Sequence, residues 1–482
     1  MKVLLAAGEV APLAKTGGLA DVAGSLPKAL QHRGVDVRIV MPKYRGVADQ
    51  AESPLEQIPG VTVPLGGRDV VVGLLQTTIA NGDVPVYLVE RDEYYDREGL
   101  FGHPDDLERF TLFSRAVTAL PGAIGWEPDV VHCHDWHAGI VPVYLKRLAP
   151  GPRPATVFTI HNLAYQGAFP KTAADLLGIA WDSPAFHDLE MGSQLNFMKA
   201  GIVAADRIST VSQRYAGEIQ TREFGEGLHG ILQSRSDALE GILNGIDYDT
   251  WNPRTDTQIA AGFGPDDLTG KAKCKQALQA EMNLPQRDVP VIGIVTRLAA
   301  QKGLDIIEEV VNELLAADIQ LVLLGTGEPQ YHALFGRLAK LLPDKTGIRL
   351  DYDAALARRI YAGSDLFLIP SRYEPCGLTQ MIGLAYGTIP IVRATGGLAD
   401  TISERGPEGN GFMFFEYSPD ALLAALDRAL AAYDDPVRWA RLMRNAFACD
   451  FSWEQSAGHY EELYQRAMAA RTAAPAPALA AS

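Results

Sequence analysis

The chain alternates short β-branched runs with longer helical patterns, and it does so in two separate blocks. The first block begins with VLLAA at 3–7 and VDVRIVM at 35–41 and runs to ATVFTI at 155–160. The pattern before this last strand predicts a helix that starts at Trp136. The second runs from VPVIGIVTRL at 289–298 to IPIVR at 389–393. Helices between buried strands are typical of parallel sheets. The sequence therefore predicts an α/β protein with two doubly wound parallel sheets.

The length of the chain agrees with two hydrophobic cores. Its 482 residues exceed the roughly 250–300 at which a single core stops growing, and three domains are the alternative from length alone. Asn-Gly, Asp and Pro in GILNGIDYDTWNP mark the expected join. Strand-like runs at about 60–90 lack intervening helices, which predicts an antiparallel insertion at a sheet edge. The expected parts are an N-terminal domain at 1–243, a C-terminal domain at 244–452, a helix at 453–471 that returns to the first domain, and a disordered tail at 472–482.

The composition of the chain limits the kinds of partner and the cellular setting that we expect. The chain has 43 Lys and Arg against 59 Asp and Glu, a formal net charge of −16, which argues against a nucleic acid or an anionic membrane surface as partner. Its four cysteines form no C-x-x-C pair, so we expect a reduced, cytoplasmic setting. The N-terminal apolar run is too short for a signal peptide or a membrane span.

One hexapeptide, TGGLAD, occurs twice, at 16–21 and at 395–400. Each copy follows a predicted strand and opens a predicted helix, where glycine lets the backbone approach a ligand and free amides favour anions or sugar hydroxyls. Because each half of the chain has one such loop, we expect the two loops to form two walls of one cleft. The alternatives are coincidence, or two helices that happen to use the same capping sequence. Lys15 can meet the same anion as the amides of Gly17 and Gly18, or can be a surface lysine beside a tight turn.

Two permanent cations follow the first strand of the second block. Arg297 and Lys302 stand where open α/β sheets bind ligands, and each charge-assisted hydrogen bond to a phosphate contributes roughly 1.5–3 kcal/mol. Glu374 follows the strand LFLIPS, and the amides of Leu378 and Thr379 open the next helix. Glu374 is therefore a candidate ligand for sugar hydroxyls, with a helix N-cap as the competing interpretation.

The segment HCHDWH at 132–137 gathers histidines and an aspartate at the end of a strand. A metal site is disfavoured because no second ligand group with metal spacing occurs elsewhere. A sugar-binding loop formed by Asp135, Trp136 and His137 is the better interpretation, and a structural histidine is the alternative for His132. His161 follows the next strand in the equivalent place, where ordinary turn chemistry is the alternative.

Two other chemistries are disfavoured by the sequence. LLGTGEPQ at 323–330 lacks the third glycine of a dinucleotide-binding turn, since Gln330 stands there. No acid is placed for a glycosidase pair with Glu374, because the residue eight positions later is Ile382. A step through an oxocarbenium-like state, with the departing phosphate stabilised by fixed cations, is therefore the simpler mechanism.

Taken together, these motifs resemble those of the bacterial glycogen synthases and plant starch synthases, over about residues 1–471. The matching motifs, in the order of the family, are KTGGLADV at 15–22, HDWHAG at 134–139, IHNLAYQG at 160–167, KAGI at 199–202, ILNGID at 242–247, RLAAQKG at 297–303, EPCGLTQ at 374–380 and the second TGGLAD. The family consists of retaining glucosyltransferases with the GT-B fold, in which two Rossmann-like domains face a central cleft.

The resemblance implies a hexosyltransferase that moves glucose from ADP-glucose to the non-reducing 4-OH of glycogen or another α-1,4-glucan. It implies no cofactor and no metal, because cations neutralise the diphosphate. The implied catalytic residues are Glu374, His161, Asp135, Lys302 and Arg297. The implied nucleotide-sugar-binding residues are Lys15, Gly17, Gly18, Asp21, Asn244, Arg297, Lys302, Tyr352, Cys376, Gly377, Leu378 and Thr379.

The sequence departs from the family pattern in two places. DYDA at 351–354 replaces the usual Gly-Tyr with a following Glu, so stacking of the adenine on Tyr352 is a hypothesis. TVSQRYA at 210–216 replaces the commoner TVSPTYA, with no expected change in function. Another GT-B enzyme, such as a phosphorylase or a nucleotide-sugar epimerase, and a catalytically silent glucan-binding protein remain the alternatives. The physical chemistry of these residues does not decide between ADP and UDP.

Overall fold

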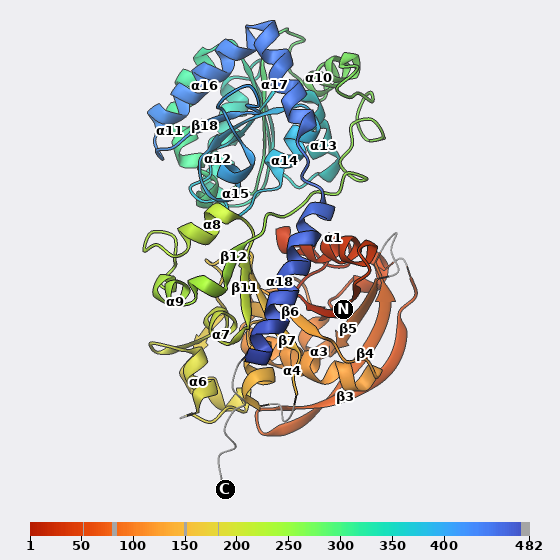
Figure 1. Cartoon of the computed structure of the whole chain (residues 1–482). Helices are drawn as coiled ribbons and strands as arrows, with labels where there is room; N and C mark the ends of the chain where they lie inside the picture. The colour runs from red at the N-terminus through yellow and green to blue at the C-terminus, as the bar shows by residue number, and fades with distance from the viewer. Residues whose placement is uncertain (52, 80–83, 149–151, 182, 474–482) are drawn as a thin grey trace. The chain divides into compact units, whose positions relative to one another are not determined.

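The computed structural model describes residues 1–51, 53–79, 84–148, 152–181 and 183–473, which form two compact units. The first unit contains Met1–Gly245 and the residues from Trp453 onward, and the second contains Ile246–Ser452 (Figure 1). The final helix, α18 (Trp453–Ala473), includes the first two residues of the expected tail, and 474–482 lie outside the described residues.

The first unit is built on one large sheet. Its strand order is β12 (Leu239–Gly241), β11 (Arg207–Thr210), β7 (Ala155–Ile160), β6 (Val130–His134), β1 (Lys2–Ala6), β2 (Asp36–Pro42), β5 (Pro85–Glu90), β4 (Arg68–Thr78) and β3 (Glu56–Leu65). The strands from β12 to β5 pair in parallel, whereas β4 pairs antiparallel with both β5 and β3 at the edge. β5, the last strand-like run of the expected insertion, therefore also belongs to the parallel sheet. The central strands β1, β6 and β7 are almost fully buried and consequently apolar along most of their length.

The helices of the first unit cover this sheet. The main ones are α1 (Gly18–His32), α4 (Asp106–Ile124) and α18, and α18 packs on α1 and on β7. The shorter elements are α2 (Val47–Gln50), α3 (Asp92–Tyr95), η1 (Trp136–Ala138), α5 (Val141–Val143), η2 (Tyr144–Leu148), η3 (Lys171–Leu177), α6 (Pro184–Leu189), α7 (Phe197–Ala204), α8 (Gln213–Glu218), α9 (His229–Ser234), η4 (Ser236–Ala238) and a small sheet of β8 (Ala168–Pro170), β10 (Gln194–Asn196) and β9 (Glu190–Met191).

The helix expected from Trp136 is not one regular helix. The structure replaces it with η1, α5 and the π-helical turn η2. Gly139 lies so close to α7 that an added Cβ would be 2.2 Å from the carbonyl oxygen of Phe197, and Pro142 cannot donate a backbone hydrogen bond. The tight packing at Gly139 and the proline account for the interrupted helix.

The second unit contains a sheet whose described strands are all parallel. Its order is β15 (Thr346–Arg349), β14 (Gln320–Leu324), β13 (Val291–Val295), β16 (Leu366–Ile369), β17 (Ile389–Arg393) and β18 (Phe412–Phe414). The helices are α10 (Thr269–Glu281), η5 (Ala300–Lys302), α11 (Leu304–Ala316), α12 (Pro329–Leu341), α13 (Ala354–Gly363), α14 (Thr379–Ala385), α15 (Gly396–Thr401), α16 (Pro419–Tyr433) and α17 (Pro436–Ala448). The strand order reverses between β13 and β16, and ligands of open α/β sheets bind at such a switch point.

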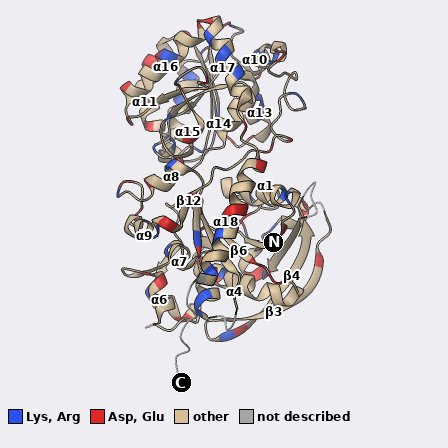
Figure 2. Cartoon of the chain, viewed as in Figure 1, with Lys and Arg blue, Asp and Glu red and all other residues tan. Residues whose placement is uncertain are grey.

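Charges of both signs are distributed over both units, as Figure 2 shows for Lys and Arg beside Asp and Glu. Within the described ranges, no helix has the length and apolarity needed to cross a membrane.

Candidate functional site

The predicted cation Lys302 and the predicted carboxylate Glu374 form an ion pair in the second unit. Lys302 Nζ lies 2.6 Å from Glu374 Oε2, and the Ser371 hydroxyl donates to the same oxygen at 2.9 Å. Their side chains are 20% and 11% exposed. The two residues meet because β13 and β16, which precede them, are neighbours in the sheet. The hydrogen bonds of this carboxylate do not cap α14, whose N-cap residue is Leu378.

Backbone contacts hold Lys302 in this position. Gly303 has a φ of 72°, and an added Cβ would be 2.0 Å from the carbonyl oxygen of Pro370. The amide of Arg372 donates to the carbonyl oxygen of Gln301 at 2.8 Å. A side chain at Gly303 would separate η5 from the turn after β16, so this close approach depends on glycine.

The two copies of TGGLAD differ in their surroundings. In the second copy, an added Cβ on Gly396 would be 1.9 Å from the carbonyl oxygen of Glu374, and one on Gly397 would be 2.1 Å from that of Cys376. In the first copy, an added Cβ on Gly18 would meet nothing within 4 Å. The glycines of the second copy thus support the turn that carries Glu374, whereas Gly18 borders open space.

In the first glycine loop, the Lys15 ammonium and the donors of Thr16 already bind carboxylates. Lys15 Nζ lies 2.6 Å from Asp21 Oδ1, and both side chains are substantially exposed. Buried Glu9 accepts a hydrogen bond from the Thr16 hydroxyl at 2.7 Å and another from its amide. Burial raises the pKa of Glu9, although hydrogen bonds from Thr16 and Gly17 oppose the shift. Sequence reasoning missed Glu9, whose signal is an acid between β1 and the glycine turn.

Each of the other candidates of the second unit follows a strand of its sheet in the sequence. Arg297 follows β13 and is exposed, and Tyr352, between β15 and α13, is 76% exposed. Cys376 is buried, and Gly377 has a φ of 72° just before α14. The amide-bearing candidates Leu378 and Thr379 form the start of α14.

Asn244 belongs to the first unit, near its boundary at Gly245. The side chain is buried, and its Oδ1 accepts no hydrogen bond from any described residue. A buried carbonyl oxygen without a donor is costly, which is compatible with a ligand-binding role for Asn244.

Asp135 and His161 are adjacent in the first unit. Asp135 Oδ1 accepts a hydrogen bond from the amide of His161 at 2.7 Å, because β6 and β7 are neighbouring strands. Asp135 has a φ of 53°, in the left-handed region that non-glycine residues rarely adopt. Burial raises the pKa of Asp135 to about 8, against the opposing effect of the amides of His161 and Asn162. Burial also lowers the pKa of His161 to about 3.

A row of buried histidines lies behind these two residues. His134 Nδ1 is 2.8 Å from His161 Nε2, and the rings of His134 and His132 have centroids 4.1 Å apart. His132 is fixed by the Tyr464 hydroxyl of α18 at 2.9 Å and by Thr159 at 2.6 Å. His132 therefore has the structural role that the sequence left open as the alternative. Over the part of the chain that the structure describes, no group of three or more His, Cys, Asp and Glu side chains is arranged to hold a metal.

His137 packs as an aromatic residue. Its ring centroid lies 4.2 Å from that of Phe101 and 4.2 Å from that of Trp136. Neither ring nitrogen has a hydrogen-bond partner among the described residues, and burial lowers the pKa of His137 to about 3. The loop that carries Phe101 therefore forms part of the packing around His137.

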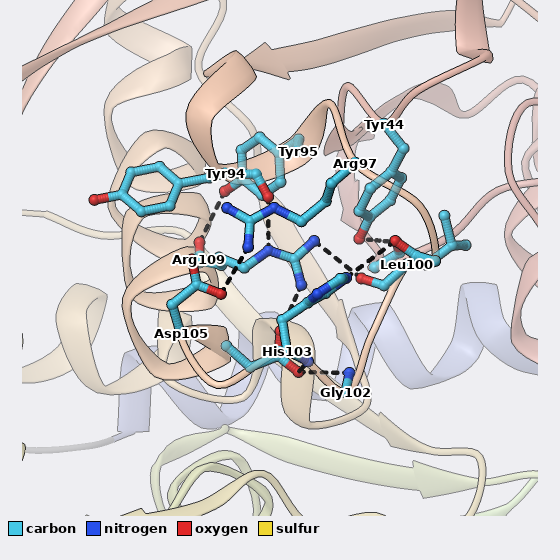
Figure 3. A network of polar contacts seen from close by, with 12 residues as sticks. Tyr44, Tyr94, Tyr95, Arg97, Leu100, Gly102, His103, Asp105 and Arg109 are labelled. Atoms are coloured by element: carbon cyan, nitrogen blue, oxygen red, sulfur yellow. Dashed lines mark hydrogen bonds and ion pairs between the residues drawn. The ribbon is translucent and has the colours of Figure 1, made fainter.

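A fully buried arginine organises that loop, residues 96–105. Arg109 donates from Nε to the carbonyl oxygen of Tyr94 at 2.8 Å and from a terminal nitrogen to that of Leu100 at 3.0 Å (Figure 3). Its other terminal nitrogen pairs with Asp106. Asp106 in turn accepts from the amide of Gly102 at 2.8 Å. Arg109 and Asp106 thus hold the middle of the loop, at Leu100 and Gly102, while Arg109 also binds Tyr94 just before it.

Comparison with known proteins agrees with this arrangement of strands and side chains. A model of the starch synthase catalytic domain matches residues 2–234, and a model of group 1 glycosyl transferases matches residues 276–445. The fold and the site thus define a glycosyltransferase of the GT-B class.

Similar proteins specify the family. A glycogen synthase from Moorella thermoacetica is 46% identical, with 98% of each chain covered, and one from Syntrophotalea carbinolica is 48% identical, with 97% of this chain and 99% of the relative covered. The chain belongs to the glycogen synthase and starch synthase family, which confirms the resemblance seen in the motifs.

Solved structures agree. The catalytic domain of starch synthase IV from Arabidopsis thaliana, bound to ADP and acarbose, matches with a TM-score of 0.88 and 37% identity over 97% of this chain and 99% of that chain. Sucrose-phosphate synthase from Thermosynechococcus elongatus, 20% identical with a TM-score of 0.58, shares the fold.

The buried Arg109 network predicts an unequal effect of two arginine substitutions. Arg109→Met leaves the Asp106 carboxylate buried and unpaired, so we expect a loss of about 3–5 kcal/mol in the free energy of unfolding. Arg97→Met, which removes the partly exposed pair with Asp105 at 2.9 Å, should cost about 1 kcal/mol or less. Chemical denaturation followed by tryptophan fluorescence measures both, and equal losses would contradict the assigned role of Arg109.

The raised pKa of Asp135 predicts a specific dependence of stability on pH. Folding raises its pKa from 3.8 to about 8, so the folded protein retains a proton that the unfolded chain releases over this range. The stability from this group is complete below pH 4 and is lost as the pH rises towards 8. The Tm of the native protein should therefore fall relative to that of Asp135→Asn between pH 5 and 8. Asp344→Asn controls for the loss of an exposed carboxylate, and parallel curves for Asp135→Asn and the native protein would contradict the shift.

Proposed function

We propose that this chain is a glycogen synthase that transfers glucose from ADP-glucose to the non-reducing 4-OH of an α-1,4-glucan, with retention of the anomeric configuration. The observation that carries this proposal is the ion pair of Lys302 and Glu374 at the switch point of the second sheet. It joins a phosphate-binding cation to a carboxylate that can bind sugar hydroxyls. The names of the bacterial relatives and the ADP and acarbose bound to starch synthase IV support the assignment.

The second unit supplies the groups that stabilise the leaving phosphate. An ammonium has three N–H donors, so Lys302 can retain Glu374 while it donates to a phosphate oxygen. Arg297 adds a second permanent cation, and the amides of Leu378 and Thr379 add the positive end of α14. As the sugar bond breaks, negative charge collects on the diphosphate, and these fixed groups lower the barrier by stabilising it. We assign the adenine to the exposed ring of Tyr352.

The hydrogen bonds of Glu374 define its role. Its carboxylate accepts from Lys302 and Ser371, and these two hydrogen bonds orient it as an acceptor. A sugar hydroxyl can donate to the remaining lone pairs. Glu374 thus binds the glucose of the donor while Lys302 holds the phosphate next to it.

The first unit supplies groups that we assign to the reacting sugar and to a phosphate. Asp135 and His161 are buried, adjacent and held in one geometry by the hydrogen bond between them. Lys15 is released easily from Asp21, because an exposed ion pair contributes only about 0–1 kcal/mol. A donor phosphate can therefore replace Asp21 at the Lys15 ammonium beside Gly18.

Substitution of the phosphate-binding cation tests the proposal. Lys302→Ala should lower the rate of ADP release from ADP-glucose in the presence of glycogen by about 100-fold or more, because one preorganised donor to developing charge is worth this much. Glu374→Gln should also cut turnover strongly. Lys340→Ala, an exposed lysine on α12, is the matched control and should keep full activity. Full activity of Lys302→Ala, or phosphorolysis of glycogen without a sugar nucleotide, would contradict the assignment.

We also propose that transfer needs no metal. Lys302 and Arg297 carry two permanent positive charges, which is the charge that a divalent cation would bring to the diphosphate. Transfer should therefore proceed at an unchanged rate after dialysis against EDTA. Loss of activity that Mg²⁺ restores would contradict this part of the proposal.

A further inference from the structure

His134 is a buried residue of the first unit whose role the proposed reaction does not yet explain. It lies between His132, whose ring it stacks against, and His161, to which its Nδ1 is hydrogen-bonded at 2.8 Å. Its other nitrogen, Nε2, has no hydrogen-bond partner among the described residues. The hydrogen bonds of His161 to the described chain run through its amide and its Nε2, which leaves Nδ1 for a ligand.

Both rings are neutral in the folded protein. Burial lowers the pKa of His134 well below its ordinary value and that of His161 to about 3. A neutral imidazole carries one N–H and one bare nitrogen. The hydrogen bond between His134 Nδ1 and His161 Nε2 therefore contains one proton, and its position fixes the tautomers of both rings.

Only two arrangements satisfy this hydrogen bond. In the first, His134 donates from Nδ1, its Nε2 is a bare lone pair, and His161 carries its proton on Nδ1. In the second, His161 donates from Nε2, and His134 is left with a buried N–H at Nε2 that meets no acceptor. Buried N–H groups without an acceptor are rarer in proteins than unsatisfied acceptors, so the first arrangement is favoured.

We propose that His134 is a positioning residue that holds His161 as the Nδ1–H tautomer, so that His161 presents a hydrogen-bond donor, and not a lone pair, to an oxygen of the reacting sugar. The part of this inference that concerns the sugar rests on the proposed function. His132 packs against His134, but its own hydrogen bonds go to Tyr464 and Thr159, so it takes no part in the hydrogen bond between His134 and His161.

The tautomer can be observed directly in the unliganded protein. The chain has ten histidines, and labelling their rings with ¹³C and ¹⁵N gives one set of signals for each. The signal that disappears in His161→Asn belongs to His161. At pH 7.5 the ring shifts of His161 should be those of the Nδ1–H form. Shifts of the Nε2–H form would overturn the inference, whatever the activity of the protein.

Two substitutions at one position test the role of the donor. His134→Asn places an amide N–H near the former Nδ1, so it should keep the His161 tautomer and most of the kcat. His134→Leu removes the partner, so the His161 signal should shift towards a tautomer mixture and kcat should fall about 100-fold, as for other misplaced catalytic groups. His132→Asn, which disturbs the same buried row without touching the hydrogen bond to His161, controls for lost stability.

The outcomes separate this inference from the proposed function. Equal kcat values for His134→Leu and His134→Asn, at equal stability, would overturn the positioning role. A loss in His132→Asn as large as that in His134→Leu would also overturn it, because packing alone would then explain the effect. A native protein that shows the Nδ1–H form of His161 but transfers no glucose would refute the proposed function and still support the tautomer assignment.

Discussion

The site of the second unit depends on one ion pair between side chains that are 72 residues apart in the sequence, Lys302 and Glu374. Taking both charges largely out of water is costly, and the close approach and the Ser371 hydroxyl offset that cost. Several glycines serve the same contact: Gly303 lets η5 approach Pro370, and Gly396 lets α15 lie beneath the turn of Glu374. The backbone at the strand ends is thus shaped around a preorganised pair of opposite charges.

The two candidate sites hold their polar groups in different ways. In the second unit, Lys302 and Glu374 pair with each other. In the first unit, burial lowers the pKa of His161 and raises that of Asp135. A neutral imidazole and a buried carboxyl suit the binding of sugar hydroxyls, whereas paired ions suit a diphosphate.

The alternation of strands and helices, the two sheets and the positions of the motifs could be predicted, because they depend on residues that are close together in the sequence. The contact of Lys302 with Glu374 could not, since it depends on β13 lying beside β16, and strand order is a property of the whole sheet. The hydrogen bond of His134 to His161 was missed for the same reason. The helix expected from Trp136 failed because the close approach of Gly139 to Phe197 is invisible in the local pattern.

The first unit is built from two stretches of chain, one on each side of Ile246–Ser452, and α18 in the later stretch supplies the Tyr464 hydroxyl that holds His132. On the ribosome, the second unit therefore has its whole sequence available before the first one does. The nascent first unit must wait through the synthesis of more than two hundred intervening residues, 246–452, before its last helix emerges. Until then His132 lacks its tyrosine partner, so chain termination upstream of residue 464 would release a protein whose histidine row is incompletely held.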